Sequence, residues 1–445
     1  MGVKEASAKY QIAGDAAPAG EDVPVGFKRT EVGLIPEDWD ITALGALGAF
    51  SKGRGVRRDE ASSGDLPCVR YGELYTHHND IVREFNSHIS QSVASGSAPI
   101  KQGDILFAGS GETKEEIGKS AAFLGPEPAY AGSDIVILSP RNSDPAFLGY
   151  ALNVNYVVRQ KAARGQGDAV VHITSNGLAN LIVALPPSIS EQQDIARALS
   201  DVDALIESLQ QLIAKKRALK QGVMQALLTG RQRLPGFSQD WEVRKLADFG
   251  DVYGGLSGKT KRDFGHGQGR FVTFIGVMSN VVVDMTGLEV VDVKGSESQN
   301  EVLYGDLLFN GSSETPQEIG LCAAVREQVD GVYLNSFCFG YRMQPGAPLD
   351  PLYLVYFYRS NAGRELLAPL AQGAIRYNLS KRALLGLEFG LPSKEEQSAI
   401  ATVLSDMDAE IDALETRLAK SRELQAGMMQ ALLTGRIRLP LGTAA

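Results

Sequence analysis

The sequence QALLTGRQRLP at residues 225–235 recurs as QALLTGRIRLP at residues 430–440, with ten of the eleven positions identical. Each copy follows a long helical pattern, and its glycine stands where a helix C′ residue would be. A proline, which cannot continue a helix, comes five residues after that glycine. We therefore expect two long helices that end in the same way, 205 residues apart.

The repeat extends well beyond these endings. Residues 191–235 align without gaps on residues 396–440, and 27 of the 45 positions are identical. A weaker repeat relates GDILFAGSGETKEEIG (residues 103–118) to GDLLFNGSSETPQEIG (residues 305–320), at an offset of 202. A period near 200 residues is far too long for a solenoid repeat. It indicates a duplicated two-part unit, and hence pseudo-twofold symmetry within one chain.

This duplication predicts the organisation of the chain. We expect a mobile N-terminal tail (1–25), a first α/β domain (26–185), a first helical region (186–235), a second α/β domain (236–390), a second helical region (391–440) and a C-terminal tail (441–445). The N-terminal tail has few large apolar residues to offset the cost of ordering it. The helical regions are much more alike than the α/β domains. That contrast predicts one role shared by both helical regions and a different role for each α/β domain.

Each helical region is predicted to form one long helix. Ser188 with Glu191, and Ser393 with Glu396, are candidate capping boxes at matched positions. About 41 residues separate cap from stop, a span of about 60 Å at ~1.5 Å per residue. The apolar seam follows heptad spacing through Ile195, Leu199, Val202, Ile206, Leu209 and Ile213, and through Ile400, Leu404, Met407, Ile411, Leu414 and Leu418. Two such seams in one chain favour an antiparallel coiled coil over a helix packed on its own domain, because the helix is longer than a 160-residue domain is wide.

Both helical regions carry two further features at matched places. The polar interruptions are Lys216 and Lys220 in the first copy, and Ser421 and Gln425 in the second. Gly222 and Gly427 also lie within the helices, where glycine costs about 1 kcal/mol relative to alanine. We interpret these glycines as sites where another backbone approaches closely; the alternative is that the glycine is simply tolerated.

Each α/β domain combines short β-like runs with later helical patterns, which indicates a strand-rich α/β fold. Clusters of Lys and Arg spaced by glycine occur early in both domains, at residues 51–59 and 257–263. Such side chains suit phosphate contacts and guanine, whereas Gln and Asn suit adenine. The candidate DNA-binding residues are Lys52, Arg54, Arg57, Arg58, Arg70, Arg164, Gln166, Lys259, Lys261, Arg262, Arg376 and Asn378. Solvated surface loops are the alternative, and the net charge of −9 taken alone argues against nucleic acid.

Motifs for catalysis fail in one or both copies. The segment FAGSGET (residues 107–113) resembles a methyltransferase glycine loop, but its counterpart FNGSSET loses the second glycine, and no NPPY or DPPY tetrapeptide occurs. No GxxxxGK[ST], GxSxG or HExxH motif is present. The three cysteines and five histidines lack metal-ligand spacing, and the cysteines fit a reducing cytosol. These observations predict a cytoplasmic binding protein with no catalytic residues and no metal.

In combination, the repeat order, the opening KRTEVGLIPEDW (residues 28–39), the GDILF segments and the LLTGRxRLP endings resemble the DNA-specificity subunit of a type I restriction–modification system. The resemblance covers nearly the whole chain from residue 26. It implies that the α/β domains are target recognition domains, each reading one half of a bipartite site in double-stranded DNA. The helical regions would form the antiparallel coiled coil that sets the spacer between the two halves.

The resemblance also implies partners. Two methyltransferase (modification) subunits would dock on the helical regions, and restriction/translocase subunits would complete a complex for DNA methylation and phage defence. S-adenosylmethionine, ATP and Mg²⁺ would belong to those partners, so no cofactor is expected in this chain. A coiled-coil scaffold whose α/β domains bind protein is the alternative function. A stand-alone DNA-modifying enzyme is disfavoured by the missing motifs.

Overall fold

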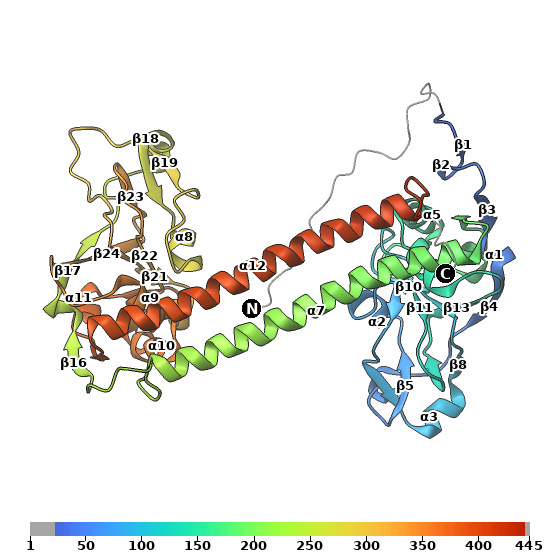
Figure 1. Ribbon diagram of the computed structural model, residues 1–445, viewed down its shortest axis with the longest axis horizontal. Helices are drawn as coiled ribbons and strands as arrows, with labels where there is room; N and C mark the ends of the chain where they lie inside the picture. The colour runs from blue at the N-terminus through green and yellow to red at the C-terminus, as the bar shows by residue number, and fades with distance from the viewer. Residues whose placement is uncertain (1–22, 441–445) are drawn as a thin grey trace. The chain divides into compact units, whose positions relative to one another are not determined.

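The computed structural model describes residues 23–440, and the chain divides into two compact units. The first unit comprises residues 1–208 and 418–445, and the second comprises residues 209–417. Each unit therefore combines one α/β domain with part of each long helix (Figure 1). The predicted tails lie outside the described residues, apart from residues 23–25.

The first unit is built around a five-stranded sheet. Its strands run in the order β4 (Gly48–Lys52), β13 (Ile135–Pro140), β9 (Ile105–Ala108), β11 (Ser120–Phe123) and β6 (Ile81–Val82). A second sheet has the order β7 (Ser87–Ile89), β5 (Leu66–Val69), β12 (Ala129–Ala131) and β8 (Ala98–Ile100). Strand β9 is apolar throughout because both of its faces are covered: Ile105 and Phe107 pack with the helices, whereas Leu106 and Ala108 pack in the opposite core.

Helices cover one face of that five-stranded sheet. Helix α4 (Pro145–Ala151) begins at Asp144, whose carboxylate accepts a hydrogen bond from the Phe147 amide at 2.8 Å. Helix α5 (Asn155–Arg164) and the start of α7 (Ile189–Leu227) join the same hydrophobic cluster, which also contains Ile195 and Leu199. The beginning of the long helix is thus part of the domain core.

The second unit repeats this arrangement. Its main sheet has the order β17 (Gly250–Gly254), β24 (Cys338–Met343), β20 (Leu307–Asn310) and β22 (Cys322–Ala324). Its second sheet has the order β19 (Glu289–Val291), β18 (Phe264–Val272) and β23 (Val332–Leu334), and the covering helices are α9 (Pro351–Arg359) and α10 (Asn361–Leu367). The predicted pair of repeated α/β domains is confirmed.

The two long helices, α7 and α12 (Lys394–Leu432), have 39 residues each, and they pack antiparallel within each unit (Figure 1). In the second unit, Arg217 pairs with Glu415, whereas Lys220, further along α7, pairs with Asp408, earlier on α12. Both helices end before a glycine in the left-handed region, as the repeated ending predicts: φ is +69° at Gly230 and +68° at Gly435.

The seam residues are covered to different degrees. Seven are buried: Ile195, Leu199, Leu209, Ile213, Ile400, Leu404 and Ile411. Five are half-buried: Val202, Ile206, Met407, Leu414 and Leu418. The buried ones at the helix starts belong to the domain cores as well as to the helix pair. Each helix therefore serves two packing surfaces, and the two alternatives for the seam are not exclusive.

The proposal of close backbone approach at Gly222 and Gly427 is wrong. A Cβ atom added at either position would meet nothing within 4 Å. Both positions are exposed, so a side chain there would point into open space. The alternative of a tolerated glycine holds, and alanine at these positions would favour the helix.

The predicted capping box of the second helix is right for its serine, whereas both glutamates have another partner. Ser393 Oγ accepts a 3.3 Å hydrogen bond from the Glu396 amide, as a cap should. The Glu396 carboxylate, however, accepts two hydrogen bonds from Arg233, at 2.5 and 2.6 Å. In the first unit, Glu191 accepts in the same way from Arg438, at 2.8 and 2.6 Å. The second arginine of each LLTGRxRLP ending is thus held by the start of the opposite helix.

The first unit also buries an ionisable group in its core. Lys161, on α5, is 1% exposed, and its Nζ lies 3.2 Å from Ser120 Oγ. Burial, with a smaller contribution from Lys119, lowers the pKa of Lys161 to about 7. Burial raises the pKa of nearby Asp80 to about 6. Asp80 therefore titrates at lower pH than Lys161 does.

We expect Lys161→Met to change the pH dependence of unfolding. Between about pH 7 and pH 10 the unfolded chain holds a proton on Lys161 that the folded chain has released, so the wild type gains stability as pH rises. The gain reaches at most about 1.4 kcal/mol per pH unit, and the variant should lack it. Denaturant unfolding of both proteins from pH 6 to pH 10 measures the difference. A gap between the two proteins that stays constant with pH would contradict this account.

Candidate nucleic-acid interface

A basic turn lies on the surface of the second unit, between β17 and β18. It is the 3-10 helix η3 (Lys261–Asp263), in which Lys261 and Arg262 are exposed. The Asp263 carboxylate accepts from the amide and the hydroxyl of Thr260, at 2.7 and 2.8 Å. Hydrogen bonds from Thr260 lower the pKa of Asp263, which keeps this carboxylate ionised as the turn's anchor. The turn therefore presents two cations from a fixed backbone.

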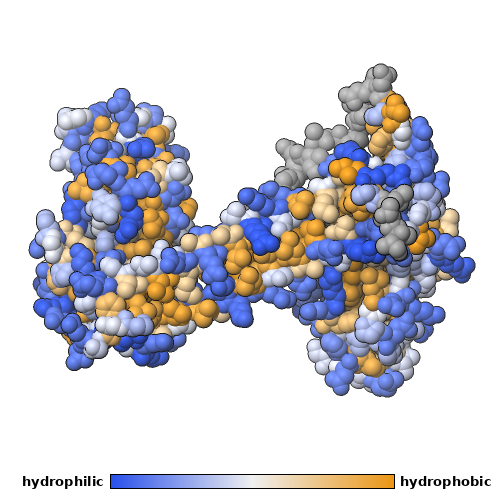
Figure 2. All heavy atoms as spheres, in the orientation of Figure 1, coloured by the Kyte–Doolittle hydropathy of each residue, from blue (hydrophilic) through white to orange (hydrophobic). Residues whose placement is uncertain are grey.

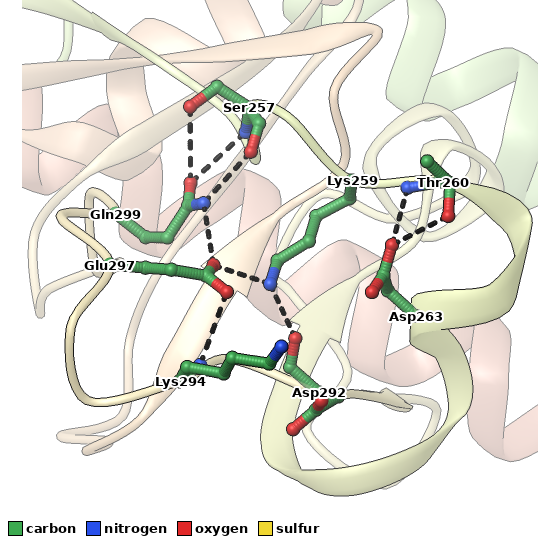
Figure 3. Close-up of polar contacts among 8 residues, drawn as sticks. All are labelled: Ser257, Lys259, Thr260, Asp263, Asp292, Lys294, Glu297 and Gln299. Carbon is green, nitrogen blue, oxygen red and sulfur yellow. Dashed lines mark hydrogen bonds and ion pairs between the residues drawn. The ribbon is translucent and has the colours of Figure 1, made fainter.

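Lys259, also predicted to contact DNA, has its ammonium engaged within the second unit. Its side chain is only 5% exposed, its Nζ donates to the Asp292 carbonyl at 2.5 Å, and it pairs with Glu297. The hydrogen bond from Lys259 lowers the pKa of Glu297. Close by, the Gln299 amide bonds the backbone N–H and carbonyl of Ser257, at 3.0 and 2.9 Å. Figure 3 shows these contacts tying the 292–299 segment to the base of the basic turn.

The five residues that follow the basic turn, FGHGQ at residues 264–268, open strand β18 as a bulged loop. The register of β18 against β19 shifts there, between Phe264 and Gly269. Gly267 has a φ of +100°, and a Cβ atom there would lie 2.5 Å from the Asp292 Cα, so only glycine fits. His266 and Gln268 are exposed. Sequence reasoning missed these two residues, although the alternating glycines beside a basic cluster were a usable signal.

The first unit has a matching turn with different neighbours. Helix η1 (Arg58–Glu60) begins at Arg57, whose amide donates to the Glu60 carboxylate at 2.7 Å. Lys52, Arg54, Arg57 and Arg58 are exposed, and Arg70 is half-buried. The five residues that follow this turn read ASSGD (residues 61–65), with no histidine or glutamine. Both units thus carry a 3-10 turn with exposed cations at matched places, followed by five residues of different chemistry.

The second pair of predicted segments lies on other strands. Arg164 donates to the carbonyls of Gln160 and Asn180, at 3.0 Å each, so its guanidinium is engaged within the domain. Gln166 is exposed just after it. In the second unit, exposed Arg376 lies over the Phe337 ring at 5.1 Å, close to exposed Asn378 on β26 (Tyr377–Leu379).

Two other kinds of feature are absent from the described part of the chain. Among residues 23–440, no cluster of His, Cys, Asp or Glu side chains could hold a metal ion. Within the same residues, no helix is long and apolar enough to cross a membrane. The features that stand out are the two basic turns and the duplicated helical frame.

Comparison with known protein families identifies the family of this chain. A sequence profile described as "Type I restriction modification DNA specificity domain" matches residues 36–215 and again residues 238–422. The chain belongs to this family. The two matches correspond to the two halves of the internal repeat, which confirms the resemblance seen in the sequence.

Relatives in this DNA-specificity family match more than nine-tenths of the chain. The MjaVIII specificity subunit of a type I restriction enzyme from Methanocaldococcus jannaschii is 24% identical, with 93% of this chain and 96% of the relative covered. The EcoKI specificity subunit from Escherichia coli K12 is 20% identical, with 91% and 90% covered. The crystal structure of a type I S subunit from M. genitalium has a TM-score of 0.54 at 12% identity, over 88% and 96% of the two chains. That structure supports the fold alone.

A pair of variants distinguishes the buried lysine, Lys259, from the exposed cations of the basic turn. We expect Lys259→Met to weaken sequence-specific DNA binding while leaving the salt dependence of binding unchanged, because the Lys259 ammonium is occupied by Glu297. Lys261→Met, the matched control, should instead reduce the slope of log K against log [salt] by about one. Titrations of DNA at several salt concentrations measure both slopes. A reduced slope for Lys259→Met would show that its ammonium reaches phosphate after all.

Proposed function

We propose that this chain is the DNA-reading subunit of a type I restriction–modification complex. Each α/β domain recognises one half of a bipartite target in double-stranded DNA. The observation that carries the proposal is the pair of matched basic turns beside loops of different chemistry. Matched cations suit sequence-independent phosphate contacts, whereas different loops suit different base sequences. The chain itself is non-catalytic in this proposal.

The helix pair supplies the frame in this proposal. Two half-sites read from one face of B-DNA lie about 34 Å apart, one helical turn. Helices of 39 residues each are long enough to set such a spacer, at ~1.5 Å per residue. The strong similarity of the two helical regions supports two equivalent docking sites for two methyltransferase subunits.

Exposed apolar side chains on the helices support docking there. Leu219 on α7 is 54% exposed, and Leu424 on α12 is 55% exposed. The two leucines are related by the 205-residue offset of the repeat. Figure 2 shows apolar residues along the helical part of the surface. In our proposal these surfaces receive the methyltransferase subunits, and restriction/translocase subunits join through them. S-adenosylmethionine, ATP and Mg²⁺ then act on those partners.

Mapping methylated adenines tests the function directly. In cells that carry this chain with its methyltransferase subunit, we expect one motif composed of two short specific halves and an unspecific gap of fixed length. A continuous motif would contradict the assignment of one half-site to each domain. A complete lack of new methylation in cells where the two proteins co-purify would favour the protein-binding scaffold instead.

A further inference from the structure

The polar interruption of the helix seam in the second unit is a three-way junction. Lys220 on α7 pairs with the Asp408 carboxylate on α12, and the same carboxylate accepts from the Tyr356 hydroxyl on α9 at 2.7 Å. The Lys220 and Asp408 side chains are 18% and 30% exposed, so both ions are largely shielded from water. The Lys220 ammonium also lies 5.4 Å from the centre of the Tyr356 ring. One carboxylate thus joins both long helices to the recognition domain.

The first unit has the same junction built from different residues. Asp203 on α7 accepts from the Gln425 amide on α12, and from the Tyr150 hydroxyl on α4 at 2.6 Å. Arg83, which follows β6, donates to the same carboxylate at 2.9 Å. The Asp203 side chain is 14% exposed. Asp203 and Asp408 are related by the offset of 205, as are Lys220 and Gln425.

We propose that these two junctions fix the register of the helix pair, and through it the spacer of the DNA target; the second step rests on the proposed function. Two helices with heptad seams can slide past each other by seven residues and still bring apolar positions together. A polar seam residue disfavours every register except the one in which it meets its polar partner. A slide of one heptad would place Asp408 opposite Ile213 or Leu227 instead of Lys220. The same slide would place Asp203 opposite Leu418 or Leu432 instead of Gln425.

Each slid register therefore separates the Asp408 carboxylate from its lysine and leaves it against an apolar side chain. Asp203 keeps Arg83 but loses the Gln425 amide. An uncompensated buried charge is strongly unfavourable, whereas a polar pair replaced by apolar residues is often neutral for stability. The junctions thus contribute more to the choice of register than to the total stability. This separation between register and stability is what an experiment can detect.

The test variant is the double substitution Lys220→Met with Asp408→Leu, which removes the ions and keeps the seam apolar. Its matched control, Arg217→Ala with Glu415→Ala, removes an ion pair between the same helices whose side chains are 65% and 40% exposed. Lys220→Gln is the rescue variant, because it copies the Gln425–Asp203 contact of the first unit. All three are examined in the full chain, alone and with its methyltransferase subunits.

The first readout needs no DNA. Spin labels at Ala218 and Thr402, both exposed, report the register of α7 against α12 within the second unit. We expect a single distance in the wild type, the control and the rescue variant. The double variant should add a second population displaced along the helix by about 10 Å, one heptad at ~1.5 Å per residue. A single unchanged distance in a folded double variant would overturn the register role.

The second readout is the methylation map. The double variant should keep its thermal midpoint within a few degrees, while methylated sites with additional gap lengths appear beside the original ones. A contact with a purely structural role would lower the midpoint and leave one gap length. If the spin-label distances shift but the gap does not, register and spacer are unlinked and the second step fails. If the wild type shows no bipartite motif, the proposed function fails while the distances still test the junction.

Discussion

Replacing Arg233 with alanine is expected to lower the free energy of unfolding of the second unit by about 3–5 kcal/mol. The Arg233 guanidinium makes two hydrogen bonds to Glu396, whose side chain is only 1% exposed. Trp241 Nε1 donates to the same carboxylate at 3.3 Å, too little to compensate a buried charge alone. Denaturant unfolding of the full chain, with the second transition resolved, measures the loss.

The same motif provides the control for this prediction. Arg231, two residues earlier, is exposed, and Arg231→Ala should change stability by no more than about 0.5 kcal/mol. Adding Glu396→Gln to Arg233→Ala should recover part of the loss, because the uncompensated charge is then gone. Equal effects of Arg231→Ala and Arg233→Ala would contradict a specific role for this ion pair.

Removing both basic turns is expected to have the largest effect on DNA binding. The variant replaces Arg57 and Arg58 in the first unit, and Lys261 and Arg262 in the second, with alanine. Each lost phosphate contact should reduce the slope of log K against log [salt] by about one, so four contacts reduce it by about four. Binding titrations with a methylation-mapped target, at four or more salt concentrations, measure the slope.

A loop variant in the second unit controls for general damage. His266→Ala with Gln268→Ala leaves the basic turn intact, so it should keep the slope and relax base preference in one half-site only. If the slope of log K against log [salt] stayed at its wild-type value after loss of all four cations, the basic turns would not contact DNA phosphate. Loss of preference in both half-sites after the loop change would contradict the division of labour between the domains.

Sequence reasoning recovered the duplicated frame because its signals are local. Heptad spacing, a glycine stop and a repeated motif each depend on residues close in the chain, and the structure confirms the two long helices and the two α/β domains. The partners of Glu191 and Glu396 were not accessible in this way. Arg438 lies 247 residues after Glu191, and Arg233 lies 163 residues before Glu396. Only the fold brings the members of each pair together.

The candidate DNA interface shows a similar limit. The residue type of Lys259 suggested a phosphate contact, but its role depends on Asp292 and Glu297, which a distant loop supplies. Gly222 was misread because glycine in a helix signals either close approach or tolerance, and only the coordinates show that its surroundings are open. The exposure of His266 and Gln268 depends on the bulge in β18, which only the fold shows.

The most direct test of the central claim replaces the second recognition domain with a copy of the first. A chain in which residues 236–390 are replaced by a second copy of residues 26–185 should carry the same reading surface in both units. Because the two helical regions repeat, we expect the map of methylated adenines to show the first half-site twice, in inverted orientation, mirroring the twofold repeat of the protein. If the second half-site of the original motif persisted unchanged in this chain, the second domain would not be its reader and the account would be contradicted.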